Sequence, residues 1–143
     1  MTDNAYPDIQ LRRILREAHT VALVGASANW NRPSHLVMRY LQLKGYRVIP
    51  VNPGLAGQTL NGEKVYGSLR DIPDAVDVVD IFRNPAQVPP IVEDAIAIKA
   101  KVVWMQLGIR NDEAAARLRA AGITVVQDRC MLAERKALGI GAR

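Results

Sequence analysis

A chain of 143 residues can bury one hydrophobic core, and a hydrophobic content of 49% argues against intrinsic disorder. Aromatic residues make up only 5%, which suits helices packed on a buried parallel sheet better than an aromatic-cored β-sandwich. The formal net charge of +5 allows an anionic ligand, but the basic residues are scattered without interleaved aromatics, which argues against nucleic-acid binding.

The single cysteine, Cys130, excludes an intramolecular disulfide framework and a metal site made of cysteines alone. Residues 1–20 contain three acidic residues and lack the apolar run of a signal peptide. No later segment reaches the length of a membrane span. Without a repeat or a shift in composition, we expect a single domain over residues 1–143, located in the cytoplasm and away from membranes.

The first half of the chain predicts helix, strand, helix and strand. Asp8 is expected to cap a helix, and the apolar residues 20–24, ended by Gly25, predict a fully buried strand. A second helix ends at Gly45 and leads into a strand over residues 47–51. This succession fits one βαβ crossover.

The second half continues the alternation of strands and helices, so we expect a Rossmann-like, doubly wound α/β fold with a mainly parallel sheet of about five strands. Its predicted segments are a loop over residues 55–69 with a short strand at 64–66, strands at 77–82, 101–105 and 123–126, and helices after Pro85, from Asn111 to Gly122, and over residues 131–138.

The turn after the first strand is the most informative candidate for a binding site. In open parallel sheets, ligands bind outside the carboxyl ends of the strands, where the strand order reverses. Gly25 permits a tight turn and a close approach of backbone to ligand, and the following helix directs free N–H groups at the same place. A purely structural turn and an anion-binding turn both stay open.

The residues around this turn depart from a dinucleotide fingerprint. Ser27 and Trp30 stand where G-x-G-x-x-G has glycines, and Asn52 stands where an acidic residue usually binds the ribose. No acidic residue occurs between Glu17 and Glu63, whereas four basic residues do. The local field therefore favours a phosphate-rich ligand over NAD, and a small NADP-dependent oxidoreductase remains an alternative.

Five motifs, each at the end of a predicted strand, resemble the small CoA-binding proteins, which are similar to the N-terminal CoA-binding domain of the succinyl-CoA synthetase α subunit. The resemblance extends over residues 20–138. The motifs are Val24-Gly25-Ala26-Ser27 with Arg32-Pro33-Ser34, residues 45–53, residues 79–83, residues 104–108, and Asp128-Arg129-Cys130.

The resemblance implies a fold that carries CoA across the carboxyl ends of its strands. An acid-free wall with arginines suits CoA, which has a pyrophosphate and a 3′-phosphate. The implied contacts are Gly25, Ala26 and Ser27 in the phosphate-binding turn, Arg32, Pro33 and Ser34 beside the phosphates, Asn52 and Pro53 at the nucleotide end, Phe82 and Arg83 in the middle, and Trp104, Gln106 and Gly108 along the pantetheine arm.

The sequence shows no Ser-His-Asp or Cys-His set, carboxylate pair or metal-ligand cluster. Our first hypothesis is therefore a module that binds CoA or acyl-CoA and has no catalytic groups of its own, although enzymatic activity stays open. In the synthetase, the phosphorylated histidine lies outside the CoA-binding domain. A detached CoA-binding subunit of an acyl-CoA ligase, with an unidentified partner subunit, is therefore a further alternative.

Several residues have a structural interpretation beside the functional one. Trp104 fits a core position in an apolar strand, whereas Gln106 ends that strand and needs a polar partner. Asp77 and Asp80 are expected to cap or to form ion pairs near strand ends. Cys130 is expected to be a small buried hydrophobe rather than a redox-active thiol.

Overall fold

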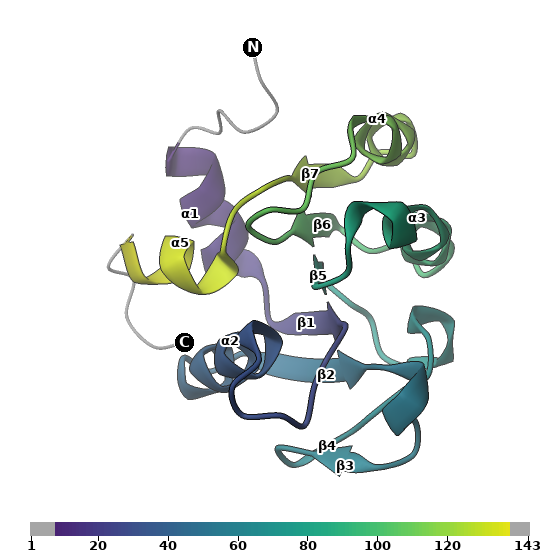
Figure 1. Ribbon diagram of the computed structural model, residues 1–143. Coiled ribbons are helices and arrows are strands. Elements are labelled where there is room, and N and C mark those ends of the chain that lie inside the picture. The colour runs from purple at the N-terminus through teal and green to yellow at the C-terminus, as the bar shows by residue number, and fades with distance from the viewer. Residues whose placement is uncertain (1–7, 138–143) are drawn as a thin grey trace.

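The computed structural model describes residues 8–137 and confirms the Rossmann-like α/β fold (Figure 1). Five parallel strands form one sheet in the order β2-β1-β5-β6-β7. Nearly every strand residue is buried, as expected for a sheet covered on both faces. The strands are β1 (Thr20–Val24), β2 (Arg47–Val51), β5 (Val78–Ile81), β6 (Val102–Met105) and β7 (Thr124–Val126).

The helices cover both faces of the sheet, and alternate strand residues point to each face. Ala22 and Val24 pack toward α3 and α4, while Val21 and Leu23 pack toward α1, α2 and α5. The helices are α1 (Asp8–Glu17), α2 (Pro33–Leu43), α3 (Val88–Ala97), α4 (Asp112–Ala120) and α5 (Met131–Ala137), and the predicted last helical residue, Leu138, lies outside the described residues.

The strand order reverses beside β1. From β1 the chain passes through α2 to β2 at one edge of the sheet, and then returns to β5 on the other side of β1. The connections after β1 and β5 therefore diverge and leave a crevice between them at the carboxyl ends of the strands. This crevice is where a ligand is expected.

The prediction of a single short strand at residues 64–66 is wrong. A small antiparallel hairpin forms instead, from β3 (Thr59–Leu60) and β4 (Glu63–Lys64), and Tyr66 makes a separate parallel bridge to Val51. The reason is the turn between the two strands, Asn61-Gly62, whose φ angles are 48° and 81°. Asn-Gly is the preferred two-residue hairpin turn because both positions need positive φ.

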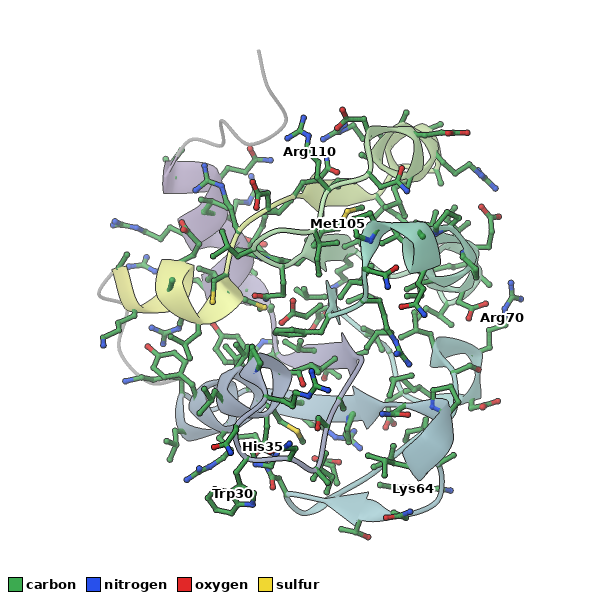
Figure 2. All side chains as sticks on the ribbon, in the orientation of Figure 1. Trp30, His35, Lys64, Arg70, Met105 and Arg110 are labelled. Carbon is green, nitrogen blue, oxygen red and sulfur yellow. The ribbon has the colours of Figure 1, made fainter. Side chains whose placement is uncertain are left out.

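None of the helices within residues 8–137 is long and apolar enough to span a bilayer. Charged side chains such as Lys64, Arg70 and Arg110 lie at the periphery, whereas Met105 lies within the sheet (Figure 2).

Candidate functional site

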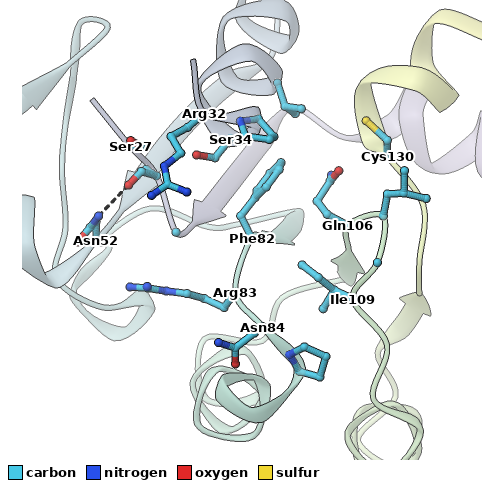
Figure 3. Close-up of a pocket in the computed structure, with 17 residues that line it drawn as sticks. Ser27, Arg32, Ser34, Asn52, Phe82, Arg83, Asn84, Gln106, Ile109 and Cys130 are labelled. Atoms are coloured by element: carbon cyan, nitrogen blue, oxygen red, sulfur yellow. Dashed lines mark hydrogen bonds between the residues drawn. The ribbon is translucent and has the colours of Figure 1, made fainter. Parts of the chain in front are cut away.

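A cavity of about 750 Å³ lies at the carboxyl ends of the strands, over the reversal point (Figure 3). Its size falls within the range of about 300–1,000 Å³ that is typical of small-molecule sites. Its walls come from the ends of all five parallel strands and from the start of α2. The lining residues are Gly25, Ala26, Ser27, Arg32, Pro33, Ser34, Val37, Asn52, Phe82, Arg83, Asn84, Pro85, Gln106, Leu107, Gly108, Ile109 and Cys130.

The turn after β1 has the backbone conformation that the sequence predicted for it. Gly25 has a φ of +93°, and its N–H donates to the carbonyl of Val51 at 3.0 Å. The N–H of Ala26 donates to the same carbonyl at 3.3 Å. Gly25 therefore has a structural role, and the turn it makes still forms part of the cavity wall.

The Asn52 side chain joins the ends of β1 and β2. Its Nδ2 donates to the carbonyl of Ala26 at 2.7 Å (Figure 3). Its Oδ1 accepts from the N–H of Gly54 at 2.8 Å. Because both polar groups of the amide have backbone partners, Asn52 fixes the shape of this end of the cavity.

The cavity has a positively charged half near β1, β2 and α2. Arg32 comes from the start of α2 and Arg83 from the end of β5, and both side chains lie in this half (Figure 3). Within residues 8–137, neither guanidinium has an ion-pair or hydrogen-bond partner, and no Asp or Glu lines the cavity. Helix α2 begins here, as Pro33 and Ser34 line the wall, so its dipole adds positive potential. Two unpaired arginines and a helix N-terminus make this half suited to an anion.

The other half, over β6 and β7, is uncharged. Figure 3 shows Gln106, Ile109 and Cys130 on this side, away from Arg32 and Arg83. Leu107, next to Gln106 in the loop after β6, adds further apolar surface, and Phe82 lies between the two halves (Figure 3). The half-buried Cys130 thus belongs to the cavity wall, and the amide of Gln106 is the polar side chain among apolar neighbours.

The prediction that Asp80 caps a strand end or forms an ion pair is wrong. Asp80 is fully buried on β5, and its Oδ1 accepts from Gln106 Nε2 at 2.6 Å. Burial raises the pKa of Asp80 to about 7, although the hydrogen bond from Gln106 opposes the shift. The prediction for Asp77 is confirmed, since Asp77 accepts from the N–H groups of His19 and Thr20 and pairs with Lys101 at 3.3 Å.

Eleven of the thirteen candidate residues therefore line the cavity, and Pro53 and Trp104 do not. Trp104 is fully buried and its Nε1–H donates to the carbonyl of Arg129 at 2.8 Å, because its position on β6 points it into the core beneath α1 and α5. Pro53 borders a separate hollow of about 300 Å³, which also touches Arg83.

Six further residues line the cavity that were not among the predicted contacts, although one of them, Cys130, belongs to the last of the five motifs. Asn84, Leu107 and Ile109 each lie next to a predicted contact in the sequence, and Pro85 follows Asn84, so adjacency could have found these four. Val37 is one helical turn beyond the start of α2. Ile109 and Cys130 come from the loops after β6 and β7, whose positions depend on strand order. The six are Val37, Asn84, Pro85, Leu107, Ile109 and Cys130.

His35 supports the loop after β1 rather than lining the cavity. It is buried, and its Nδ1 donates to the carbonyl of Ser27 at 2.8 Å. The Trp30 ring stacks on the His35 ring with centroids 5.4 Å apart (Figure 2). The guanidinium carbon of Arg39 lies over the Trp30 ring, 4.3 Å from its centroid. The described residues contain no cluster of three His, Cys, Asp or Glu side chains that could hold a metal ion.

A family model described as a CoA-binding domain matches residues 19–136. The chain belongs to this CoA-binding domain family. The resemblance seen in its five motifs is therefore confirmed over nearly the whole length of the described chain.

Known relatives of this CoA-binding domain protein include both small proteins and one longer enzyme subunit. YneT, an uncharacterised Bacillus subtilis protein, is 36% identical over 122 residues, which cover 85% of this chain and 89% of YneT. The α subunit of an ADP-forming acetate–CoA ligase from Pyrococcus furiosus is 35% identical over 88 residues, 59% of this chain but only 19% of that subunit. A solved structure from Thermus thermophilus has a TM-score of 0.90 and 43% identity, and the match covers 93% of this chain and 99% of that one.

Proposed function

We propose that this CoA-binding domain protein binds CoA or an acyl-CoA in the cavity at the carboxyl ends of its strands. The observation that carries the proposal is the division of the cavity into two halves. One half has two unpaired arginines and no lining acid among the described residues, and the other is uncharged. CoA has the same division, with phosphates at one end and a neutral pantetheine arm at the other.

The residues of the charged half fit the phosphates. The backbone of the Gly25-Ala26-Ser27 turn and the start of α2 would approach the pyrophosphate, and Arg32 and Arg83 would neutralise phosphate charge from two sides. Asn52 would border the nucleotide end. The pantetheine arm would then run past Phe82 toward Gln106.

Binding without chemistry fits the side chains present. The cavity wall offers Cys130 as its one nucleophilic thiol and holds no carboxylate or histidine among the described residues. The similarity to about a fifth of a CoA ligase subunit supports a module that holds CoA for reactions performed elsewhere. A ligase partner recovered by pull-down of the tagged chain would point to a detached subunit.

The direct test is calorimetric titration of the full chain with CoA, 3′-dephospho-CoA and NADPH. We expect micromolar or tighter binding of CoA, about tenfold weaker binding without the 3′-phosphate, and weakening of both with added salt. NADPH carries similar phosphates but lacks the pantetheine arm, so it should bind more weakly than CoA. Tighter binding of NADPH than of CoA would overturn the proposal and favour the oxidoreductase.

A further inference from the structure

Gln106 is a buried amide at the floor of the uncharged half of the cavity. Only 3% of its surface is exposed, yet it belongs to the cavity wall. Its Nε2 donates to Asp80 Oδ1 at 2.6 Å, which leaves Asp80 Oδ2 buried without a partner. No group within residues 8–137 donates a hydrogen bond to Gln106 Oε1. A polar atom of this kind, on a side chain packed among apolar neighbours, calls for a partner from a ligand.

Asp80 determines which end of the Gln106 amide faces the cavity. Asp80 lies in the middle of the sheet, level with Leu23 on β1 and Trp104 on β6, and is 0% exposed. In the structure, Asp80 accepts from the NH₂ group of Gln106 and not from its oxygen, and at pH 8, where the carboxylate is ionised and has acceptors only, this is the orientation that pairs the two groups. With its NH₂ group held by Asp80, the amide of Gln106 has its oxygen, Oε1, left to bind a ligand.

The nearby backbone donors are already engaged. The N–H of Gly108 donates to Asp128 Oδ1 at 2.6 Å, and the N–H of Ile109 donates to the carbonyl of Gln106 at 2.8 Å. These bonds hold the loop after β6 in place and remove two donors from this wall. The uncharged half therefore presents a fixed acceptor in the form of Gln106 Oε1.

We propose that Asp80 is a positioning residue, which holds Gln106 so that its Oε1 faces the cavity as an acceptor for an uncharged hydrogen-bond donor on the tail of the ligand. This inference rests on the proposed function and extends it to the recognition of the neutral arm. In CoA, the uncharged donors are the amide N–H groups of pantetheine and the terminal thiol. A tail that carried acceptors only would leave Oε1 unpaired and buried, at a cost in affinity.

The test compares three ligands at pH 8: CoA, acetyl-CoA and 3′-phospho-ADP, which has the charged head without the arm. In Gln106→Met, CoA should bind about fivefold more weakly, whereas the affinity for 3′-phospho-ADP should be unchanged. Acetyl-CoA keeps the amides and lacks the thiol. An equal loss for acetyl-CoA assigns the donor to an amide, and no loss assigns it to the thiol.

The role of Asp80 is tested by Asp80→Ala, which leaves the amide of Gln106 free to turn. CoA binding should weaken by a few fold while 3′-phospho-ADP binding is retained, and the double variant should lose no more than Gln106→Met alone. If Asp80→Ala does not fold, the isosteric Asp80→Asn replaces it, with a smaller loss expected because an amide can still accept from Gln106.

Gln127→Met is the matched control, because Gln127 is a second buried glutamine that ends a strand but does not line the cavity. Its CoA affinity should equal that of the unmodified protein. Two results overturn the inference: equal losses for CoA and 3′-phospho-ADP, or additive losses in the double variant. Absence of CoA binding by the unmodified protein is a different result, since it refutes the proposed function itself.

Discussion

Gly25 lies directly against the backbone of Phe82, and a Cβ atom added to Gly25 would lie 2.4 Å from the Phe82 carbonyl oxygen. This contact brings the turn after β1 onto the end of β5, at the point where the strand order reverses. The two wall segments on either side of the reversal are thus set by one close backbone approach that only glycine permits.

Gly25→Ala should lower the free energy of unfolding by about 3 kcal/mol, because the clash with Phe82 adds to the strain of a positive φ. Gly122→Ala is the matched control, since Gly122 has a φ of +82° but no atom within 4 Å of the added Cβ. It should cost only about 1 kcal/mol. Chemical denaturation measures the free energy of unfolding of both variants. Equal losses would show that the backbone at Phe82 can move to accommodate the added Cβ.

Arg32→Ala and Arg83→Ala should each weaken CoA binding about tenfold, because each removes an unpaired guanidinium from the charged half of the cavity. Both variants should also show a shallower dependence of affinity on salt. Arg12→Ala is the control, as Arg12 is exposed on α1 away from the cavity and changes the net charge equally. Calorimetry that finds all three variants alike would refute a phosphate contact for Arg32 and Arg83.

The free energy of unfolding should contain a component from Asp80 that falls as the pH rises. The folded pKa of about 7 lies above the ordinary value of 3.8, so the folded state holds a proton that the unfolded state has released between these values. This stabilisation is complete below pH 3.8 and is lost by about pH 7, with an upper bound of about 4 kcal/mol.

Asp80→Asn isolates that component, because the amide does not titrate. Denaturation at several pH values between 4 and 8 should show the stability of the unmodified protein declining relative to that of the variant. Parallel pH profiles for the two proteins would mean that the carboxyl group of Asp80 keeps an ordinary pKa.

Trp104→Phe should lower the free energy of unfolding by about 2 kcal/mol and leave CoA affinity unchanged within twofold. The variant loses the hydrogen bond to the Arg129 carbonyl and leaves a small void in the core. Thermal denaturation and calorimetry on the same sample separate the two effects. Weaker CoA binding at unchanged stability would instead indicate that Trp104 contacts the arm of the ligand.

The class of the fold and the edge of the sheet that carries the cavity follow from the local pattern of residues along the chain. Apolar runs such as residues 20–24 predict strands buried on both faces, and the helices between them make the sheet parallel. The carboxyl ends of parallel strands meet at one edge, so the turns at Gly25 and Asn52 were predicted to lie together, and both line the cavity.

Which side chains at that edge face the cavity, and which face one another, depends on how the strands are arranged in the folded protein. Trp104 on β6 fills the core with residues of α1 and α5, whereas Gln106, directly after the end of β6, lines the cavity. Asp80 meets Gln106 because β5 and β6 are neighbours. Strand order and register determine such contacts, and the local periodicity of a sequence does not encode them.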